Sequence, residues 1–169
     1  TACIELAGDN ARVQPRPLHG VVTVPPSKSE THRALILAAR SFEPVRIQQP
    51  LLAQDTHATR GAIEAFGASV DDERACWLVR SKRLGPPDRV IECGNSGTTL
   101  RLMTAQAALL PATIRLTGDE SLQRRPNEPL LNALESLGVE VSHHDGRAPI
   151  TLKGPLRGGE VRLPGGLSS

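Results

Sequence analysis

The chain has 169 residues, of which 38% are hydrophobic and 22% charged, and its formal net charge is +2. This composition is typical of a globular protein, and the length is sufficient to bury a core. Two phenylalanines, one tryptophan, no tyrosine and so small a net charge argue against a surface that binds nucleic acid. Only three of the 20 basic residues are lysines, and arginine is the side chain that favours bidentate binding of phosphate and carboxylate groups.

Several classes of protein are disfavoured by what the sequence lacks. No apolar run approaches the ~18 residues of a membrane span, and the N-terminal residues have no signal pattern. The three cysteines, Cys3, Cys76 and Cys93, are odd in number and lack the spacing of metal ligands. We therefore expect a cytoplasmic protein without a metal or a membrane contact. We also predict that Cys93 is a small, buried hydrophobic residue.

Apolar periodicity predicts an alternation of strands and helices. Residues 1–19 contain a short apolar stretch followed by glycine and proline, which predicts a short strand and a linker. From residue 20 the prediction is strand 20–24, helix 29–40, strand 45–49, helix 55–66, and a hairpin of 68–71 with 76–80, then strand 89–93, helix 97–110, strand 113–117, helix 127–137, and a hairpin of 139–142 with 149–152.

Short local signals mark the ends of these elements. Asp55 and Thr56 supply N-cap acceptors for the second helix, and Gly67 and Gly138 are suited to end helices. Residues 143–147 read His-His-Asp-Gly-Arg, which could suggest a metal site. Adjacent side chains on a strand point to opposite sides, however, and Asp-Gly is a hairpin signal, so we predict a turn.

The predicted elements repeat along the chain. Arg33 and Arg101 lie 68 residues apart, each shortly after a turn rich in small residues, and the following elements correspond in order. A third copy begins at Val161, whose Pro164 matches Pro25. We therefore predict an α/β (α+β) fold of β-α-β-α-β-β units with mixed sheets. Unit one covers residues 20–84, unit two 85–157, and 158–169 begin a third unit in which the chain stops.

The central motif is the turn Gly94-Asn-Ser-Gly97, which joins a strand to a helix. Free backbone N–H groups and the helix dipole make such a turn suited to an anion. It lacks the Gly-Lys-Ser/Thr ending of a P-loop. The alternative is a turn that only connects the two elements.

Three equivalent turns around a pseudo-threefold axis would bring small polar residues and a lysine to one anion site. The turns comprise Ser27, Lys28 and Ser29 in unit one, Asn95 to Thr98 in unit two, and Gly166 to Ser169 in unit three. Arg33 and Arg101 could reach this site or pack against a neighbouring unit. Arg124 or Arg125, just before a helix, could bind a second phosphate or carboxylate, or lie in a solvated loop.

The motifs together resemble one enzyme family, 5-enolpyruvylshikimate-3-phosphate synthase. The matching segments begin at Pro26 (Pro-Ser-Lys-Ser-x-x-x-Arg-Ala-Leu), Gly94 (Gly-Asn-Ser-Gly-Thr-Thr-x-Arg), Gly118 (Gly-Asp-x-Ser-Leu-x-x-Arg-Pro) and Gly165 (Gly-Gly-Leu-Ser-Ser). The resemblance implies two inside-out barrel domains of three units each, of which this chain covers the first two-fifths. Residues 1–19 would belong to the C-terminal domain, and 20–169 to the N-terminal, substrate-binding domain.

The resemblance implies transfer of the enolpyruvyl group of phosphoenolpyruvate to the 5-hydroxyl of shikimate 3-phosphate, without a metal or organic cofactor. Lys28 would act in catalysis and contact both substrates. The remaining site residues fall into a group for shikimate 3-phosphate, Ser29, Arg33, Ser168 and Ser169, and a group for phosphoenolpyruvate, Asn95, Gly97 and Arg125. Pro26 and His32 depart from the family's usual Gly and Asn.

Three further expectations complete the sequence-based account. The partner is the missing C-terminal part of the same protein, which we expect to be a monomer, and the fragment alone should be inactive. One alternative is a UDP-N-acetylglucosamine enolpyruvyl transferase, which shares the fold but needs a reactive loop cysteine. The other is a non-catalytic module that binds a phosphorylated metabolite.

Overall fold

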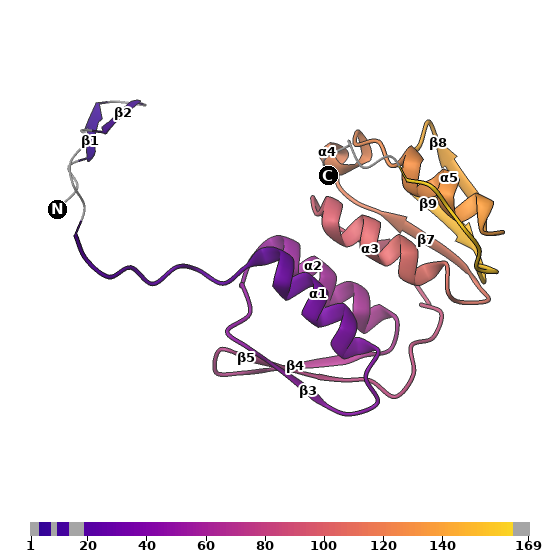
Figure 1. The fold of residues 1–169 in the computed structure, drawn as a ribbon, viewed down its shortest axis with the longest axis horizontal. Coiled ribbons are helices and arrows are strands. Elements are labelled where there is room, and N and C mark those ends of the chain that lie inside the picture. Colours follow the sequence, from indigo (N-terminus) through magenta and orange to yellow (C-terminus); the bar gives the residue numbers. More distant parts are fainter. Residues whose placement is uncertain (1–3, 8–9, 14–18, 164–169) are drawn as a thin grey trace.

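The structure is a computed structural model that describes residues 4–7, 10–13 and 19–163 (Figure 1). Near the N-terminus β1 (Ile4–Ala7) and β2 (Asn10–Val13) pair in antiparallel fashion. The sequence predicted a single short strand here. Figure 1 shows this hairpin apart from the other elements.

Two helices and a three-stranded antiparallel sheet form the first half of the fold. The sheet has the order β3-β5-β4, and α1 and α2 pack on it (Figure 1). Leu35, Phe66 and Trp77 are fully or almost fully buried between these layers. The elements are α1 (Lys28–Ala39), β3 (Val45–Gln48), α2 (Gln54–Ala65), β4 (Ser69–Glu73) and β5 (Cys76–Arg80).

The second half has a four-stranded sheet of order β6-β7-β9-β8, in which β6 and β7 are parallel. The ends of α5, β8 and β9 lie one or two residues from the prediction, and three other elements differ more clearly. β6 is shorter, α3 ends three residues earlier, and α4 was not predicted. The elements are β6 (Ile91–Glu92), α3 (Gly97–Ala107), β7 (Thr113–Thr117), α4 (Glu120–Gln123), α5 (Glu128–Ser136), β8 (Glu140–His144) and β9 (Arg147–Lys153).

The two sheets share a strand order, since β3-β5-β4 corresponds to β7-β9-β8. Gly67 and Gly138 follow α2 and α5 with positive φ values, which confirms their predicted place at helix ends. Asp145 and Gly146 also have positive φ and form the predicted turn between β8 and β9. Both halves therefore end in a hairpin of the same kind.

The predicted strand at residues 20–24 is wrong for this structure. No ladder joins these residues to another strand in the described part of the chain. Val21, Val22 and Val24 are 100%, 84% and 76% exposed. Hydrogen bonds to a neighbouring strand define a β-strand. In the second half β6 pairs with one edge of β7, whereas the corresponding edge of β3 has no partner among the described residues.

The predicted N-cap at Asp55 is also wrong. Helix α2 begins at Gln54 with Ala53 as its N-cap residue. The Ala53 N–H donates to Thr56 Oγ1 at 3.1 Å, and Thr56 Oγ1 donates to Leu51 O at 2.6 Å. Because Thr56 forms the side-chain hydrogen bonds at the start of α2, the Asp55 carboxylate is available to another partner.

The core consists mainly of aliphatic side chains, as the small number of aromatic residues in the sequence predicts. One buried cluster includes side chains of both halves, among them Leu35, Ile63, Leu100 and Ile150. Helices α1, α2 and α3 lie next to one another and form the layer that joins the halves (Figure 1). Within the described residues, no helix is long and apolar enough to cross a bilayer, and no cluster of three metal-ligating side chains occurs.

Gly118 tests the close packing between the loop after β7 and the glycine turn. A Cβ at Gly118 would lie 2.4 Å from Gly94 O and 2.4 Å from Leu122 Cδ2. Gly118→Ala should therefore lower the free energy of unfolding by about 1–3 kcal/mol. Gly61→Ala is the matched control, because nothing lies within 4 Å of the added carbon in α2 and alanine favours the helix by about 0.5–1 kcal/mol. Urea unfolding measures both changes, and equal stability of Gly118→Ala and wild type would contradict the packing.

Candidate active site

The glycine turn places the start of α3 at the centre of the candidate site. β6 ends at Glu92, Cys93 is fully buried, and Gly94 has a φ of 56°. Ser96 is the N-cap, and its Oγ accepts a hydrogen bond from Thr99 N at 3.1 Å. The N–H groups in the first turn of a helix have no intrahelical acceptor, so the start of α3 is suited to an anion.

The buried Cys93 confirms the prediction that this residue is a small hydrophobic one. Burial, with a smaller contribution from Glu92, raises the pKa of the Cys93 thiol to about 12. The side chain is therefore a neutral thiol at pH 7 and a poor nucleophile.

Arg125 lies against this helix start. One of its guanidinium nitrogens donates a hydrogen bond to Asn95 Oδ1. A Cβ built on Gly97 would lie 3.3 Å from another Arg125 nitrogen and 3.4 Å from one of Arg101. The structure thus brings together Asn95, Gly97 and Arg125, the three residues of the predicted phosphoenolpyruvate group.

Two features of the chain hold Arg125 in this place. The loop after β7 is fixed to the glycine turn, because Asp119 N donates to Gly94 O at 2.9 Å. The short helix α4 follows, with Asp119 as its N-cap and Leu122 fully buried. Arg124, the neighbouring arginine, points elsewhere and pairs with Glu120 on the exposed side of α4.

Arg101 supports the loop that carries Arg125. Its Nε donates to Asn127 Oδ1 at 3.1 Å, and a second nitrogen donates to Pro126 O at 3.4 Å. Asn127 is buried, and its Nδ2 donates to Arg125 O at 2.9 Å. Arg101 thus binds a loop of its own unit, and not a neighbouring unit, while one of its guanidinium nitrogens lies close to Gly97.

The start of α1 carries the other predicted residues. Ser27 caps this helix through Glu30 N at 3.3 Å. Lys28 forms an ion pair with Asp55 at 2.8 Å, across the starts of α1 and α2. Ser29 and Arg33 are exposed, and within the described residues Arg33 has no ion pair. Ser168 and Ser169 lie outside the described residues.

Buried hydroxyl groups connect these helix starts. Thr99 Oγ1 of α3 donates to Asp55 O of α2 at 3.2 Å and lies 2.7 Å from Thr59 Oγ1 of the same helix. Because Asp55 also binds Lys28, the start of α2 lies between the lysine and the start of α3. Lys28, at the start of α1, is therefore linked through the start of α2 to the start of α3, against which Arg125 lies.

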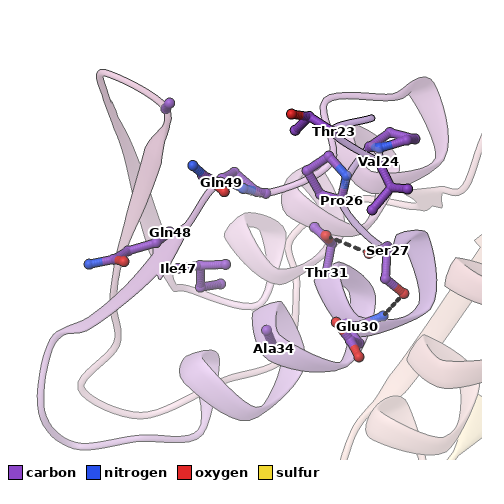
Figure 2. A pocket seen from close by; sticks show the side chains of 13 residues that line it. Thr23, Val24, Pro26, Ser27, Glu30, Thr31, Ala34, Ile47, Gln48 and Gln49 are labelled. Carbon is purple, nitrogen blue, oxygen red and sulfur yellow. Dashed lines mark hydrogen bonds between the residues drawn. The ribbon is translucent and has the colours of Figure 1, made fainter. Parts of the chain in front are cut away.

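A groove lies beside this site, and Ser27 is the one residue of the predicted turns that lines it. Figure 2 shows it between residues 23–27 and strand β3, with Val24, Pro26 and Ile47 among its lining side chains. Its volume is about 990 Å³. The groove follows the unpaired edge of β3, where the predicted strand 20–24 is absent.

Sequence reasoning missed three residues that shape the site. Asp55 was assigned to a helix cap, Asn127 to the opening of a helix, and Gly118 only to a motif. Asp55 acts through Lys28 and Asn127 through Arg101, both far away in the sequence. Gly118 acts through its close contact with Gly94 O, 24 residues earlier. Of these three residues, only Gly118 belonged to a motif that can be identified from the local sequence.

Comparison with known proteins first defines the class. The enolpyruvyl transferase NikO from Streptomyces tendae has a TM-score of 0.51 at 18% identity over 92% of this chain, a likeness of fold alone. The EPSP synthase from Acinetobacter baumannii has a TM-score of 0.78 at 27% identity, and the match covers 86% of this chain and 35% of that protein. The mixed α/β fold is therefore that of enolpyruvyl transferases.

The family is defined more narrowly by sequence. The family model for EPSP synthase (3-phosphoshikimate 1-carboxyvinyltransferase) matches residues 13–169, and the chain belongs to this family. It is 46% identical over 168 residues to the 3-phosphoshikimate 1-carboxyvinyltransferase of Halobacterium salinarum, covering 97% of this chain and 38% of the relative. For the enzyme of Methanothermobacter thermautotrophicus the identity is 50% over 156 residues, with 90% and 37% covered. The chain thus spans less than two-fifths of the length of these relatives.

Proposed function

We propose that this chain is the N-terminal part of an enzyme that transfers the enolpyruvyl group of phosphoenolpyruvate to the 5-hydroxyl of shikimate 3-phosphate. The observation that carries the proposal is the cluster of Asn95, Gly97 and Arg125 at the start of α3. A guanidinium group beside a helix start suits a small dianion, and the chain belongs to a family named for this reaction.

The proposed roles follow the two groups of residues. Asn95, Gly97 and Arg125 bind phosphoenolpyruvate, and Ser29 and Arg33 bind shikimate 3-phosphate with Ser168 and Ser169. Lys28 contacts both substrates. Its ion pair with Asp55 holds the ammonium group at the start of α1, where a substrate anion can compete for it.

The reaction needs electrostatic stabilisation more than a cofactor. A proton adds to the methylene carbon of phosphoenolpyruvate, and the 5-hydroxyl oxygen bonds to the cationic carbon next to it as the hydroxyl proton is released. Loss of a proton from the new methyl group and of phosphate from the adjacent carbon then restores the double bond. Two phosphates and a carboxylate meet in the site, so fixed cations must offset their charge. Lys28, Arg33 and Arg125 are the cations that this chain contributes in the proposal, which includes neither a metal nor an organic cofactor.

The domain organisation is part of the proposal. Residues 1–19 belong to the C-terminal domain, residues 20–84 and 85–157 are two copies of one unit, and 158–169 begin a third. The shared order β3-β5-β4 and β7-β9-β8 supports the repeat. The missing C-terminal part completes the cleft, and the monomeric state and cytoplasmic location stay predictions.

The cysteines favour this reaction over that of a UDP-N-acetylglucosamine enolpyruvyl transferase, which needs a reactive loop cysteine. In the described residues Cys93 is buried, with its pKa raised to about 12, and Cys76 begins strand β5. Neither lies in an exposed loop. Cys3 lies outside the described residues.

Arg125 gives the sharpest test of the assigned roles. Arg125→Ala in the full-length protein should raise the KM for phosphoenolpyruvate about 10- to 150-fold, because a charge-assisted bidentate contact is worth roughly 1.5–3 kcal/mol. The KM for shikimate 3-phosphate should change much less. Arg124→Ala is the matched control, since it removes the same charge from the adjacent, outward-facing arginine. Steady-state kinetics with each substrate varied in turn give both KM values. An equal rise of the two would show that Arg125 does not bind phosphoenolpyruvate specifically.

Gly97 tests how closely the substrate approaches the helix start. Its φ is not positive, so alanine creates no backbone strain, and an added Cβ meets two guanidinium nitrogens, at 3.3 and 3.4 Å, and Leu122 Cδ1 at 3.9 Å. Gly97→Ala should keep the melting temperature and raise the KM for phosphoenolpyruvate by about 5- to 30-fold, from roughly 1–2 kcal/mol of crowding. Binding of shikimate 3-phosphate should be nearly unchanged. A lowered melting temperature with unchanged phosphoenolpyruvate affinity is the opposite result and would assign Gly97 to the fold alone.

A further inference from the structure

One buried side chain, that of Asn127, binds both arginines that lie against the start of α3. Its Oδ1 accepts from Arg101 Nε at 3.1 Å, and its Nδ2 donates to Arg125 O at 2.9 Å. Asn127 is only 3% exposed. Because a guanidinium N–H can only donate and a carbonyl oxygen can only accept, these partners fix the orientation of the carboxamide. Both contacts together therefore need a short side chain with one donor and one acceptor.

Capping of helix α5 does not account for this side chain. Asn127 is the N-cap residue of α5, yet its side chain makes no capping hydrogen bond. The local contacts are made by its backbone, since Asn127 N donates to Gly146 O at 2.8 Å and Leu131 N donates to Asn127 O at 3.1 Å. The carboxamide thus serves the two arginines and not the helix that it begins.

The backbone of Arg125 is bound on both sides of the residue. Its N–H donates to Leu122 O at 3.0 Å, and its carbonyl accepts from the Asn127 carboxamide. Leu122 is fully buried, so the first contact is anchored in the core. Loss of the second contact would leave the Arg125 carbonyl without its partner and allow this peptide to rotate. The direction of the arginine side chain therefore depends on Asn127.

Both guanidinium groups are held by neutral amide and carbonyl oxygens. In the described part of the chain neither of them forms an ion pair with a carboxylate. The neighbouring Arg124, by contrast, pairs with Glu120. The Nη1 atoms of Arg101 and Arg125 lie 3.4 and 3.3 Å from the position of a Cβ built on Gly97. Two positive charges that no carboxylate offsets thus lie on one side of the start of α3.

We propose that Asn127 is a positioning residue for phosphoenolpyruvate. It holds the backbone of Arg125, and its neutral carboxamide fixes Arg101 without offsetting the charge of that guanidinium. The inference rests on the proposed function and adds to the site a residue that contacts no substrate itself. A small dianion beside Gly97 meets two positive charges that are already fixed, so less ordering is needed when it binds.

Two substitutions separate this role from a purely structural one. Asn127→Leu removes both hydrogen bonds without adding charge. Asn127→Asp keeps the acceptor for Arg101, but it loses the donor to Arg125 O and places a carboxylate beside the Arg101 guanidinium. A residue that only supports the fold would be harmed more by leucine, which breaks both contacts. A residue that keeps the site positively charged would be harmed more by aspartate.

In the full-length protein Asn127→Asp should raise the KM for phosphoenolpyruvate at least about 20-fold, and Asn127→Leu about 5- to 10-fold. The KM for shikimate 3-phosphate should stay within about 2-fold in both variants. Asn132→Asp is the matched control, because it adds the same charge at an exposed position of α5. It should leave both KM values within about 2-fold, since solvent screens the charge there.

Two results of these kinetics would overturn the proposal. One is an effect on the KM for phosphoenolpyruvate that is larger for leucine than for aspartate. The other is a parallel rise of the KM values of both substrates. The melting temperature of each variant is measured first. Should the leucine variant not fold, the comparison of Asn127→Asp with Asn132→Asp decides, and equal KM values for phosphoenolpyruvate in these two variants would refute the role of Asn127.

A double-mutant cycle tests whether Asn127 acts through Arg125. In an Arg125→Ala background, Asn127→Leu should raise the KM for phosphoenolpyruvate by less than about 2-fold, because the side chain that it positions is absent. The same increase as in the wild-type background would show that Asn127 acts elsewhere, and would contradict the proposal.

Exchange of the Arg101 Nε proton with water separates this inference from the proposed function. Measured by NMR on the full-length protein, the exchange should be slow in wild type and in Asn127→Asp and at least about 10-fold faster in Asn127→Leu, which alone removes the acceptor. This measurement does not depend on turnover. Absent phosphate release by wild type would refute the enolpyruvyl transfer, whereas equal exchange rates in the three proteins would refute the arrangement around Asn127.

Discussion

The contact between the Thr59 and Thr99 hydroxyls, 2.7 Å apart, joins the helices of the two halves of this fold. Both side chains are fully buried, and a buried hydroxyl without a partner costs about 1–3 kcal/mol. The pair therefore favours one register of α2 against α3, because sliding one helix along the other would break this buried hydrogen bond. Apolar packing alone would allow more than one such arrangement.

The placement of the charged groups depends on this junction. Asp55, which accepts from Thr99, holds Lys28 from α1. On the other side, the glycine turn and Asn127 hold Arg125 over the start of α3. One cation, Lys28, is thus held at the start of α1, and the other, Arg125, is held by its loop against the start of α3. Such preorganised charge is the main means by which an enzyme without a cofactor stabilises developing charge.

Local sequence signals predicted the elements and the motif residues, and tertiary partners could not be predicted. Gly97 and Arg125 were identified because turn chemistry and motif order are local properties. The strand at residues 20–24 was wrong because its apolar pattern needs a neighbouring edge, and here Val22 and Val24 remain exposed. Aspartate is a common N-cap residue, yet the partner of Asp55 is Lys28, 27 residues earlier. Asn127 indicated only the start of a helix, since its contact with Arg101 joins residues 26 positions apart.

The central claim is that these residues form part of an enolpyruvyl transfer site, and phosphate release measures it most directly. The full-length protein should release one phosphate for each shikimate 3-phosphate consumed, and none from phosphoenolpyruvate alone. The isolated 169-residue chain, which would lack the C-terminal side of the cleft, should release none from both substrates together. Phosphate release that does not require shikimate 3-phosphate, or steady release by the isolated chain, would contradict the account.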